Sequence, residues 1–407
     1  MSRTTKLAVV LIVLLSAMRI LAATRLPEYN YDENRRASAV QSFLSTGDFE
    51  WDVFRIGMLP VFARTDAGFS SLPFLAPSIA WAAVFGSSPQ SLRVLIMIIT
   101  TLALILLAHA ISLWYDKKSQ DKVFLLSSII ALTLPWTFLQ GFIFWDTSLA
   151  PVCLIVAFYA FTKIKLSETA KLWHQLLLPL ALVTAVYLYL PSAVPAFVLY
   201  LAAIGYLYKS KLFSLKRVVV NFVAAGLAIL PFVIFFFTFP DGNTRTGELS
   251  VFYQVSVWTG LANLFKSIAL LVGPLFLFVV GDGSRAHSIG MMGMLGALAF
   301  IPLIWTIYYK KILSQKEKLL FWIAVLGVAA ATLASALTDA NSQPHSLRAN
   351  AAAPFYIILL VLGTQKFLQK HPKATIPVYI VIALSVIAYL TAFFFLYLPV
   401  GREWFTN

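Results

Sequence analysis

The chain opens with KLAVVLIVLLSAMRILA (residues 6–22), a run of the length and hydrophobicity that crosses a bilayer as one helix. Similar runs recur up to residue 398, and 60% of the 407 residues are hydrophobic whereas only 12% are charged. A soluble domain has roughly 25% charged residues. The sequence therefore predicts an all-α polytopic membrane protein with about 11 transmembrane helices in a single domain, 1–407. The expected spans are 6–23, 92–115, 122–140, 146–162, 173–190, 192–208, 216–239, 289–309, 318–337, 350–366 and 375–398.

The basic residues predict the orientation of these spans. Nineteen of the 31 lysines and arginines, nearly all of them lysine, lie in six clusters between spans, and the positive-inside rule puts such clusters on the cytoplasmic face. We therefore expect a multi-pass protein of the plasma (inner) membrane with a cytoplasmic N-terminus. The net charge of +14 then reflects topology, and no nucleic-acid partner is expected.

Two apolar stretches, 70–86 and 266–281, are too short to be clear spans. If only one of them crossed, the lysine clusters between them would face outward. Both are therefore interpreted as juxtamembrane or re-entrant segments on the outer side, and the alternative is that both cross fully. No soluble domain is expected after the last span.

The acidic residues concentrate on the opposite face. Thirteen of the 17 lie in the predicted outer segments, where the main base is arginine. Arginine holds phosphate through a planar, bidentate fork, so the outer face is expected to act on a ligand that carries phosphate. The alternative is that these arginines only pair with the outer acids.

The first outer loop, residues 24–91, is too long for a simple connection and is expected to carry function. It contains two expected helices, 32–45 and 70–85. The first begins with YDENRR (residues 31–36), which puts Asp32 and Glu33 beside Arg35 at the membrane edge. Charge at membrane depth is costly and is usually retained for function, although acids also favour the start of a helix. A second acid, Asp146, follows Phe144-Trp145 in the next outer break and favours a convergent site.

Later outer loops supply basic and imidazole side chains. One loop contains Arg285 and His287, and another contains His345 and Arg348. Lys266 is the one lysine that falls outside the cytoplasmic clusters. No two histidines stand at i, i+4, so the histidine pattern is weak evidence for zinc.

Four short stretches together resemble a known family. They are Asp32-Glu33-x-Arg35 with Gly47-Asp48, Phe85-Gly86 with Arg93, Pro135 with Asp146, and Pro344-His345-x-x-Arg348. In order and in expected side of the membrane, the chain resembles the GT-C superfamily of integral-membrane glycosyltransferases. Within it, the chain is most similar to the aminoarabinose (lipid A) transferase and protein O-mannosyltransferase-like group.

The resemblance implies transfer of a sugar, with inversion, from a polyprenyl-phosphate donor to a lipid, glycan or protein acceptor at the outer face. It implies that Asp32 is the catalytic acid of the first loop and that Asp146 shares its site. Some relatives bind a divalent metal ion through a glutamate later in that loop. The matching region here, Arg64 to Phe69, has no glutamate, and Asp66 is the nearest candidate. No other cofactor is expected.

The chemistry of the residues agrees with this reading. Inverting transfer needs a base for the acceptor hydroxyl, and a carboxylate such as Asp32 is suitable, with Glu33 as a helper. Arg285, Arg348 and Lys266 are the candidates for binding the departing phosphate. Asp146 would stabilise positive charge on the sugar or position the acceptor. Arg35, His287 and His345 are auxiliary candidates.

Two other functions fit a protein with many spans. A transporter or flippase of lipid-linked sugars would bury charge within broken spans near the midplane, whereas the charges here gather in the outer loops. A polymerase or ligase of lipid-linked sugars would be expected to carry its main loop later in the chain. Both alternatives remain open at the level of the sequence.

Overall fold

Long apolar runs form most of the helices in a computed structural model that describes residues 3–25, 31–49, 52–65, 68–167, 171–239, 250–282, 293–338 and 345–399. The α-helices are α1 (Arg3–Ala23), α2 (Tyr31–Thr46), α3 (Leu72–Phe85), α4 (Pro89–Ser112), α5 (Lys117–Thr133), α6 (Pro135–Phe142), α7 (Ala150–Leu166), α8 (Leu172–Leu188), α9 (Ala193–Lys209), α10 (Leu215–Thr238), α12 (Val257–Leu271), α13 (Phe300–Tyr309), α14 (Gln315–Leu337), α15 (Ala353–Lys370) and α16 (Thr375–Ala392). Short turns of 3₁₀ or π helix are η1 (Asp146–Ser148), η2 (Leu190–Ser192), η3 (Leu275–Val279), η5 (Ala297–Ala299), η6 (Lys310–Ile312), η7 (Asn350–Ala352), η8 (Pro372–Ala374) and η9 (Phe393–Tyr397).

The expected all-α membrane architecture is confirmed. Among the described residues, eight helical stretches are long and apolar enough to cross a membrane, and the bent pair α5–α6 makes nine. The shorter apolar helices Val9–Ala23, Leu72–Phe85 and Leu172–Leu188 accompany them. Ten of the eleven expected spans coincide with described helices. The exception is the span expected at 289–309, of which the structure describes only η5 and the ten-residue α13 after residue 293.

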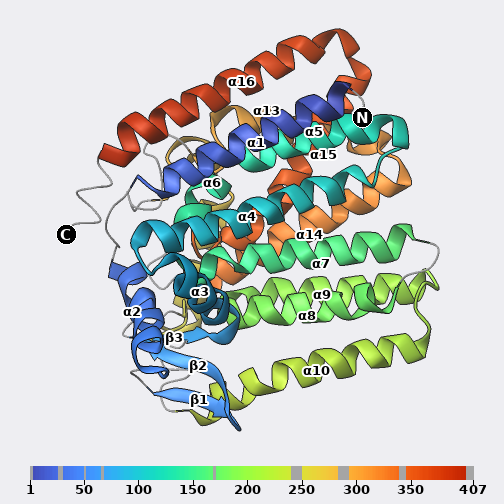
Figure 1. Cartoon of the computed structure of the whole chain (residues 1–407). Helices are drawn as coiled ribbons and strands as arrows, with labels where there is room; N and C mark the ends of the chain where they lie inside the picture. Colours follow the sequence, from blue (N-terminus) through green and yellow to red (C-terminus); the bar gives the residue numbers. More distant parts are fainter. Residues whose placement is uncertain are drawn as a thin grey trace.

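The helices stack side by side with similar axes, from α16 at one edge of the bundle to α10 at the other (Figure 1). Helix α2, helix α3 and a small sheet gather at one end, which we call the loop end. The opposite end carries Lys117, Lys165, Lys209 and Lys310, and we call it the lysine end. The largest buried apolar cluster runs through α4, α5, α7, α8, α9, α14 and α15, so the core lies along the middle of the bundle.

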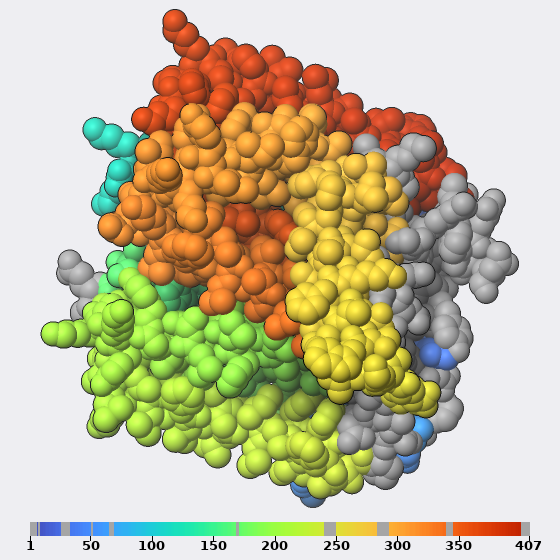
Figure 2. All heavy atoms as spheres, turned by 180° about the vertical axis from the view of Figure 1, so that it is seen from behind, coloured from blue at the N-terminus to red at the C-terminus, as the bar shows by residue number. Residues whose placement is uncertain are grey.

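Residues 250–282 take a different course. Within them, Val257–Val279 is long and apolar enough to cross a membrane. Both ends of the segment nevertheless form hydrogen bonds with residues at the loop end of the bundle. The Val251 amide donates to the Leu337 carbonyl at 3.1 Å, and the Ser346 amide donates to the Asp282 carboxylate at 2.6 Å. In Figure 2 these gold residues form an upright column, whereas α10 lies across the view as it does in Figure 1. The segment thus begins and ends at one end of the bundle, and its expected juxtamembrane or re-entrant placement on the outer side stays a prediction.

The predicted first outer loop contains the two expected helices, α2 and α3, within two residues of their predicted limits. Between them lies a three-stranded antiparallel sheet that the sequence did not predict: β1 (Val53–Ile56), β2 (Leu59–Thr65) and β3 (Gly68–Ser71), in the order β1-β2-β3. Its inner face packs on α10, where the rings of Phe62 and Phe235 stack with centroids 4.2 Å apart. This contact joins the sheet to the far edge of the bundle.

Candidate active site

Helix α2 places the predicted acids against the bundle. Glu33, Ala37 and Val40 stand at i, i+4 and i+7, and all three are fully buried, so they form the inward stripe of the helix. The helix ends at Thr46, and Gly47 follows with φ of 78°, the left-handed conformation that commonly terminates helices. Through its inward stripe, the first turn of α2 packs on the start of α4 and on the chain between α6 and α7.

Glu33 is bound on every side by protein. Arg93 of α4 donates from Nε to Oε1 at 2.9 Å and from Nη2 to Oε2 at 2.5 Å, and the Phe144 amide donates to Oε1 at 2.8 Å. Both charged side chains have no exposed surface. A buried pair with this geometry is tolerated because each charge is matched, and removing one partner would strand the other. The two residues therefore join α2, α4 and the chain between α6 and α7.

One turn along α2, Arg36 meets Asp146. The Asp146 carboxylate accepts from Arg36 Nη2 at 3.1 Å and Nε at 3.3 Å, and from the Thr147 amide at 2.9 Å. The Arg36 guanidinium also lies 5.5 Å from the Trp145 ring centroid. Unlike the Glu33–Arg93 pair, this pair keeps some surface, with side-chain exposures of 14% for Arg36 and 8% for Asp146.

The position of Asp32 on α2 is described, whereas its side chain is outside the described part of the chain. Residues four apart share one side of a helix, so position 32 lies one turn before Arg36 on the side that carries the Arg36–Asp146 pair. Arg35, the neighbouring auxiliary candidate, is partly buried on the same helix.

The later loops approach the same connection from the other side. The Ser346 amide bonds to Asp282, and His345 Nδ1 lies 3.8 Å from an Asp282 carboxylate oxygen. Helix α6 is tied to this segment, since Trp136 Nε1 donates to the Ser346 carbonyl at 3.1 Å and Gln140 Nε2 donates to Ser346 Oγ at 3.0 Å.

A further contact joins this segment to the residue beside Asp146. Asn350 Nδ2 donates to the Thr147 carbonyl at 3.4 Å. The α6–α7 connection thus lies between the start of α2 and the segment 345–350. The structure therefore gathers three predicted residues around one connection. Asp146 lies within it, Glu33 accepts from its Phe144 amide, and His345 begins the segment that contacts it through Asn350.

The predicted phosphate ligands have different surroundings. Arg348 donates from Nη1 to the Thr338 carbonyl at 2.5 Å, beyond the C-terminus of α14. Lys266 is exposed on α12. Arg285 and His287 lie outside the described residues, as does the metal candidate Asp66. Among the residues that are described, no three His, Cys, Asp or Glu side chains come together as a metal site.

Arg19 is a residue that the sequence reasoning passed over. It lies in α1 with no exposed surface, and it donates to Thr101 Oγ1 at 3.0 Å, the Leu132 carbonyl at 3.1 Å and the Thr137 carbonyl at 3.0 Å. These carbonyls flank the 58° bend between α5 and α6. Proline at the start of α6 interrupts the backbone ladder there. The Trp136 amide donates to the Met294 carbonyl instead of to Leu132, and Arg19 supplies a donor to the Leu132 carbonyl.

The course of α6, and with it the place of Asp146, is thus linked to a charge in α1. The signal was present in the sequence, because an arginine within an apolar run is rare and costly. Arg93 carried the same signal near the start of α4, but the sequence did not show that Arg93 pairs with Glu33.

Comparison with known proteins adds evidence on the fold. No family model and no curated protein matches the chain. Among solved structures, the chain is similar to ArnT from Cupriavidus metallidurans in the apo state, with a TM-score of 0.56 and 13% identity over 93% of this chain and 64% of that one. The same protein bound to undecaprenyl phosphate gives a TM-score of 0.52 and 12% identity over 88% and 60%.

A third match comes from archaea. It is the oligosaccharyltransferase AglB from Archaeoglobus fulgidus in complex with an inhibitory peptide and a dolichol-phosphate, with a TM-score of 0.51 and 12% identity over 99% of this chain and 56% of that one. The chain spans about three fifths of the length of the structures that it matches. These proteins are GT-C glycosyltransferases, so the chain has the GT-C fold, as its sequence resemblance implied.

Proposed function

We propose that the chain is an inverting glycosyltransferase that moves a sugar from a polyprenyl-phosphate donor to an acceptor at the outer face of the membrane. The observation that carries the proposal is the partly exposed Arg36–Asp146 pair, one helical turn from position 32 in a GT-C fold. The ArnT structure with undecaprenyl phosphate and the AglB structure with a dolichol-phosphate support a lipid-phosphate donor. The acceptor is a lipid, a glycan or a protein.

Asp32 is proposed as the base. Its carboxylate removes the proton of the acceptor hydroxyl while the acceptor oxygen bonds to the anomeric carbon of the sugar. The bond from that carbon to the phosphate oxygen breaks at the same time, and its electron pair leaves with the polyprenyl phosphate. Attack opposite the departing phosphate inverts the anomeric centre.

Asp146 is proposed to stabilise positive charge on the sugar or to position the acceptor. Arg36 and the Thr147 amide bond to Oδ1 of Asp146, which fixes the direction of its carboxyl group. Since the pair retains exposed surface, substrate could approach it, whereas the Glu33 carboxylate has none.

The leaving phosphate is already anionic, so positive charge helps it more than an acid would. Arg348 is the best supported candidate for binding this phosphate. Its segment contacts the site through Asn350, which donates to the carbonyl of Thr147, the residue after Asp146. Arg285 and Lys266 are kept as further phosphate ligands, and His287, His345 and Arg35 as auxiliary groups.

Glu33 is proposed to position the site rather than to touch substrate, which revises its predicted role as a catalytic helper. Three hydrogen bonds from Arg93 and Phe144 use its carboxylate. These bonds hold the first turn of α2, which contains position 32, against the α6–α7 connection. Four features stay predictions: a divalent metal ion at Asp66, location in the inner membrane, a cytoplasmic N-terminus and an active site on the external face.

The decisive experiment measures transfer of labelled sugar from polyprenyl-phosphate donors by the protein in membranes. Asp32→Asn should lower the rate by roughly 10²- to 10⁴-fold, the usual contribution of a general base. Asp48→Asn is the matched control, because Asp48 lies in the same loop with an exposed ion pair to Arg55 and should transfer at the rate of the unmodified protein.

Two results would count against the proposal. Full activity of Asp32→Asn would remove Asp32 as the base. Movement of intact donor across the membrane without transfer of its sugar would favour the flippase alternative, for which a bent span such as α5–α6 is also suited.

A further inference from the structure

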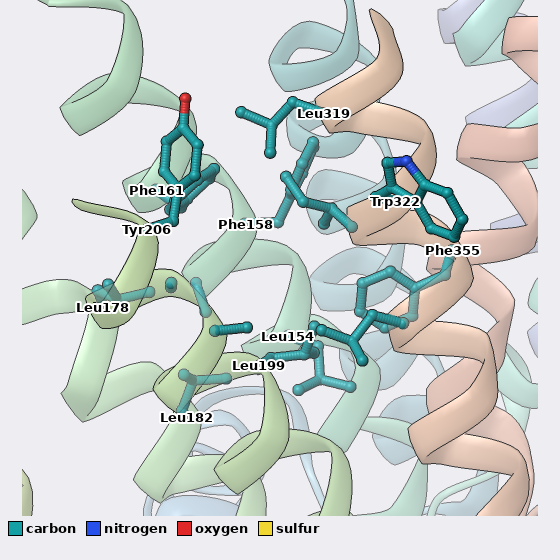
Figure 3. Close-up of a pocket in the computed structure, with 15 residues that line it drawn as sticks. Leu154, Phe158, Phe161, Leu178, Leu182, Leu199, Tyr206, Leu319, Trp322 and Phe355 are labelled. Carbon is teal, nitrogen blue, oxygen red and sulfur yellow. The ribbon is translucent and has the colours of Figure 1, made fainter. Parts of the chain in front are cut away.

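A cavity of about 220 Å³ lies among the spans, between α7, α8, α9, α14 and α15. Figure 3 shows its lining, with Phe158 and Leu154 of α7 between Tyr206 of α9 and Trp322 of α14. The remaining lining side chains are aliphatic or aromatic. In Figure 3 the Tyr206 hydroxyl points away from Leu182 on the opposite part of the lining. An apolar cavity of this size stays dry and accepts apolar ligands.

The cavity reaches the surface of the bundle beside Trp322, which is 54% exposed. Helices α9 and α14 both belong to stretches that are able to cross a membrane. The surroundings of this opening are then lipid, and the chemical group at hand to fill the cavity is a hydrocarbon chain.

Two lysines sit over aromatic residues of the cavity wall. Lys165 Nζ lies 5.1 Å from the Tyr206 ring centroid, and Lys310 Nζ lies 5.0 Å from that of Trp322. Lys165 belongs to the last turn of α7, and Lys310 precedes α14 by a short turn. Both therefore mark the end of the cavity that faces the lysine end of the bundle.

We propose that this cavity with its two lysines is a site for an anionic glycerophospholipid. One acyl chain occupies the cavity, and the headgroup phosphate lies between Lys165 and Lys310. Basic pockets between spans are a recognised means of binding anionic headgroups, and lysine acts there as a point charge. The lipid would fill the gap between α7–α9 on one side and α14–α15 on the other.

The site is separate from the proposed active site. Asp146 begins the stretch Asp146–Leu166, and Lys165 is its penultimate residue. At 1.5 Å per residue this helix is roughly 30 Å long. A phosphate at the lysines is therefore at the opposite end of α7 from a phosphate that reacts beside Asp146.

Quenching of tryptophan fluorescence by brominated acyl chains tests the proposal. The full chain is placed in nanodiscs that contain dibromostearoyl phosphatidylglycerol or phosphatidylcholine, and the signal of Trp322 is isolated by difference with Trp322→Phe. Phosphatidylglycerol should quench Trp322 at a roughly 25-fold lower mole fraction than phosphatidylcholine. The paired change Lys165→Gln/Lys310→Gln should weaken this preference by roughly 25-fold, about five-fold for each lysine.

Lys117→Gln/Lys118→Gln is the matched control, because these exposed lysines lie at the same end of the bundle on α5. It should keep the preference for phosphatidylglycerol. Ala203→Phe, which fills the cavity from α9 and leaves both lysines in place, should reduce the quenching of Trp322 by either lipid to the level of bulk lipid, because Trp322 stays exposed at the surface of the bundle.

Equal quenching by the two lipids would overturn the proposal, since it would describe ordinary boundary lipid. A preference that survives the double lysine change would overturn the headgroup assignment. Displacement of brominated lipid by an equimolar unlabelled polyprenyl phosphate would assign the cavity to the donor tail instead, and would also overturn the proposal.

Discussion

The two ends of the bundle hold charge in different ways. At the loop end, Glu33 and Arg93 have no exposed side-chain surface, and their bonds join segments that are 60 residues apart in the chain. At the lysine end, the Glu317–Lys366 pair keeps 5% and 13% of its side-chain surface, and Lys310 lies over the ring of Trp322.

The difference separates two uses of charge in one membrane protein. Exposed lysines of the lysine end such as Lys310 reach water while their stems cover aromatic surface, so they can mark a membrane boundary without fixing which helices meet. The buried Glu33–Arg93 pair at the loop end forms only in one arrangement of α2, α4 and the α6–α7 connection. Charge there specifies geometry, and the candidate active site is built on that geometry.

The largest expected effect comes from breaking the buried pair. Glu33→Gln leaves the Arg93 charge without its partner and should destabilise the fold by about 3–5 kcal/mol. Glu317→Gln, the matched change at the lysine end, should cost about 1 kcal/mol, because glutamine can still accept from the Ser314 amide and Lys366 also bonds to Gln369. Thermal unfolding in detergent, followed by intrinsic fluorescence, measures both.

Equal losses in the two variants would erase the distinction between the ends. Replacement of both members of the loop-end pair, Glu33→Gln with Arg93→Met, sharpens the reading. It should recover part of the loss of the single change, since no charge is then left buried and unmatched.

A smaller effect is expected from crowding Arg19. A Cβ at position 141 would lie 2.4 Å from Arg19 Nη2 and 2.9 Å from Thr100 Oγ1. Gly141→Ala should therefore cost about 1–3 kcal/mol through overpacking. Gly205→Ala in α9 meets nothing within 4 Å, and it should be neutral or stabilising by up to about 1 kcal/mol. Thermal unfolding in detergent measures the loss of stability in both variants. An unchanged unfolding temperature for Gly141→Ala would mean that the α5–α6 bend can shift around Arg19.

The smallest effect should come from the exposed acid of the loop end. The Phe49 amide, and then the Arg55 guanidinium, hold the pKa of Asp48 below its usual range. A lowered pKa in the folded state adds stability that is present above the unfolded value of about 4 and is lost as the pH falls through the lower folded value. Between pH 6 and pH 3 the unfolding temperature of Asp48→Asn should fall slightly less than that of the unmodified protein. A larger fall in the variant would contradict this assignment.

Much of the fold follows from local sequence pattern. The limits of α2 and α3 lie close to those expected, because polar N-terminal residues and Gly47 or Gly86 frame each helix. The sheet between them was missed, because its strands are short and mix charged with aromatic residues. Its strands depend on pairing with each other and on the contact of Phe62 with Phe235 of α10, which no local pattern contains.

The candidate site shows the same division. Adjacent acids such as Asp32 and Glu33 are equivalent in the sequence, yet neighbours on a helix point about 100° apart. Packing of α2 buries Glu33 against Arg93, and this contact decides its role. Arg36 was part of the quoted YDENRR stretch, but its partner Asp146 is 110 residues away.

The amino-acid sequence by itself determined the membrane class, nearly all of the helices and the unequal distribution of lysine and acid, because hydrophobic length and charge placement are local properties. The tertiary structure alone decided which charges meet, that Arg19 supports the α5–α6 bend, and that residues 250–282 return to the end from which they start. The physical reason is that an ion pair or a freed carbonyl finds its partner only when helices distant in the chain pack together.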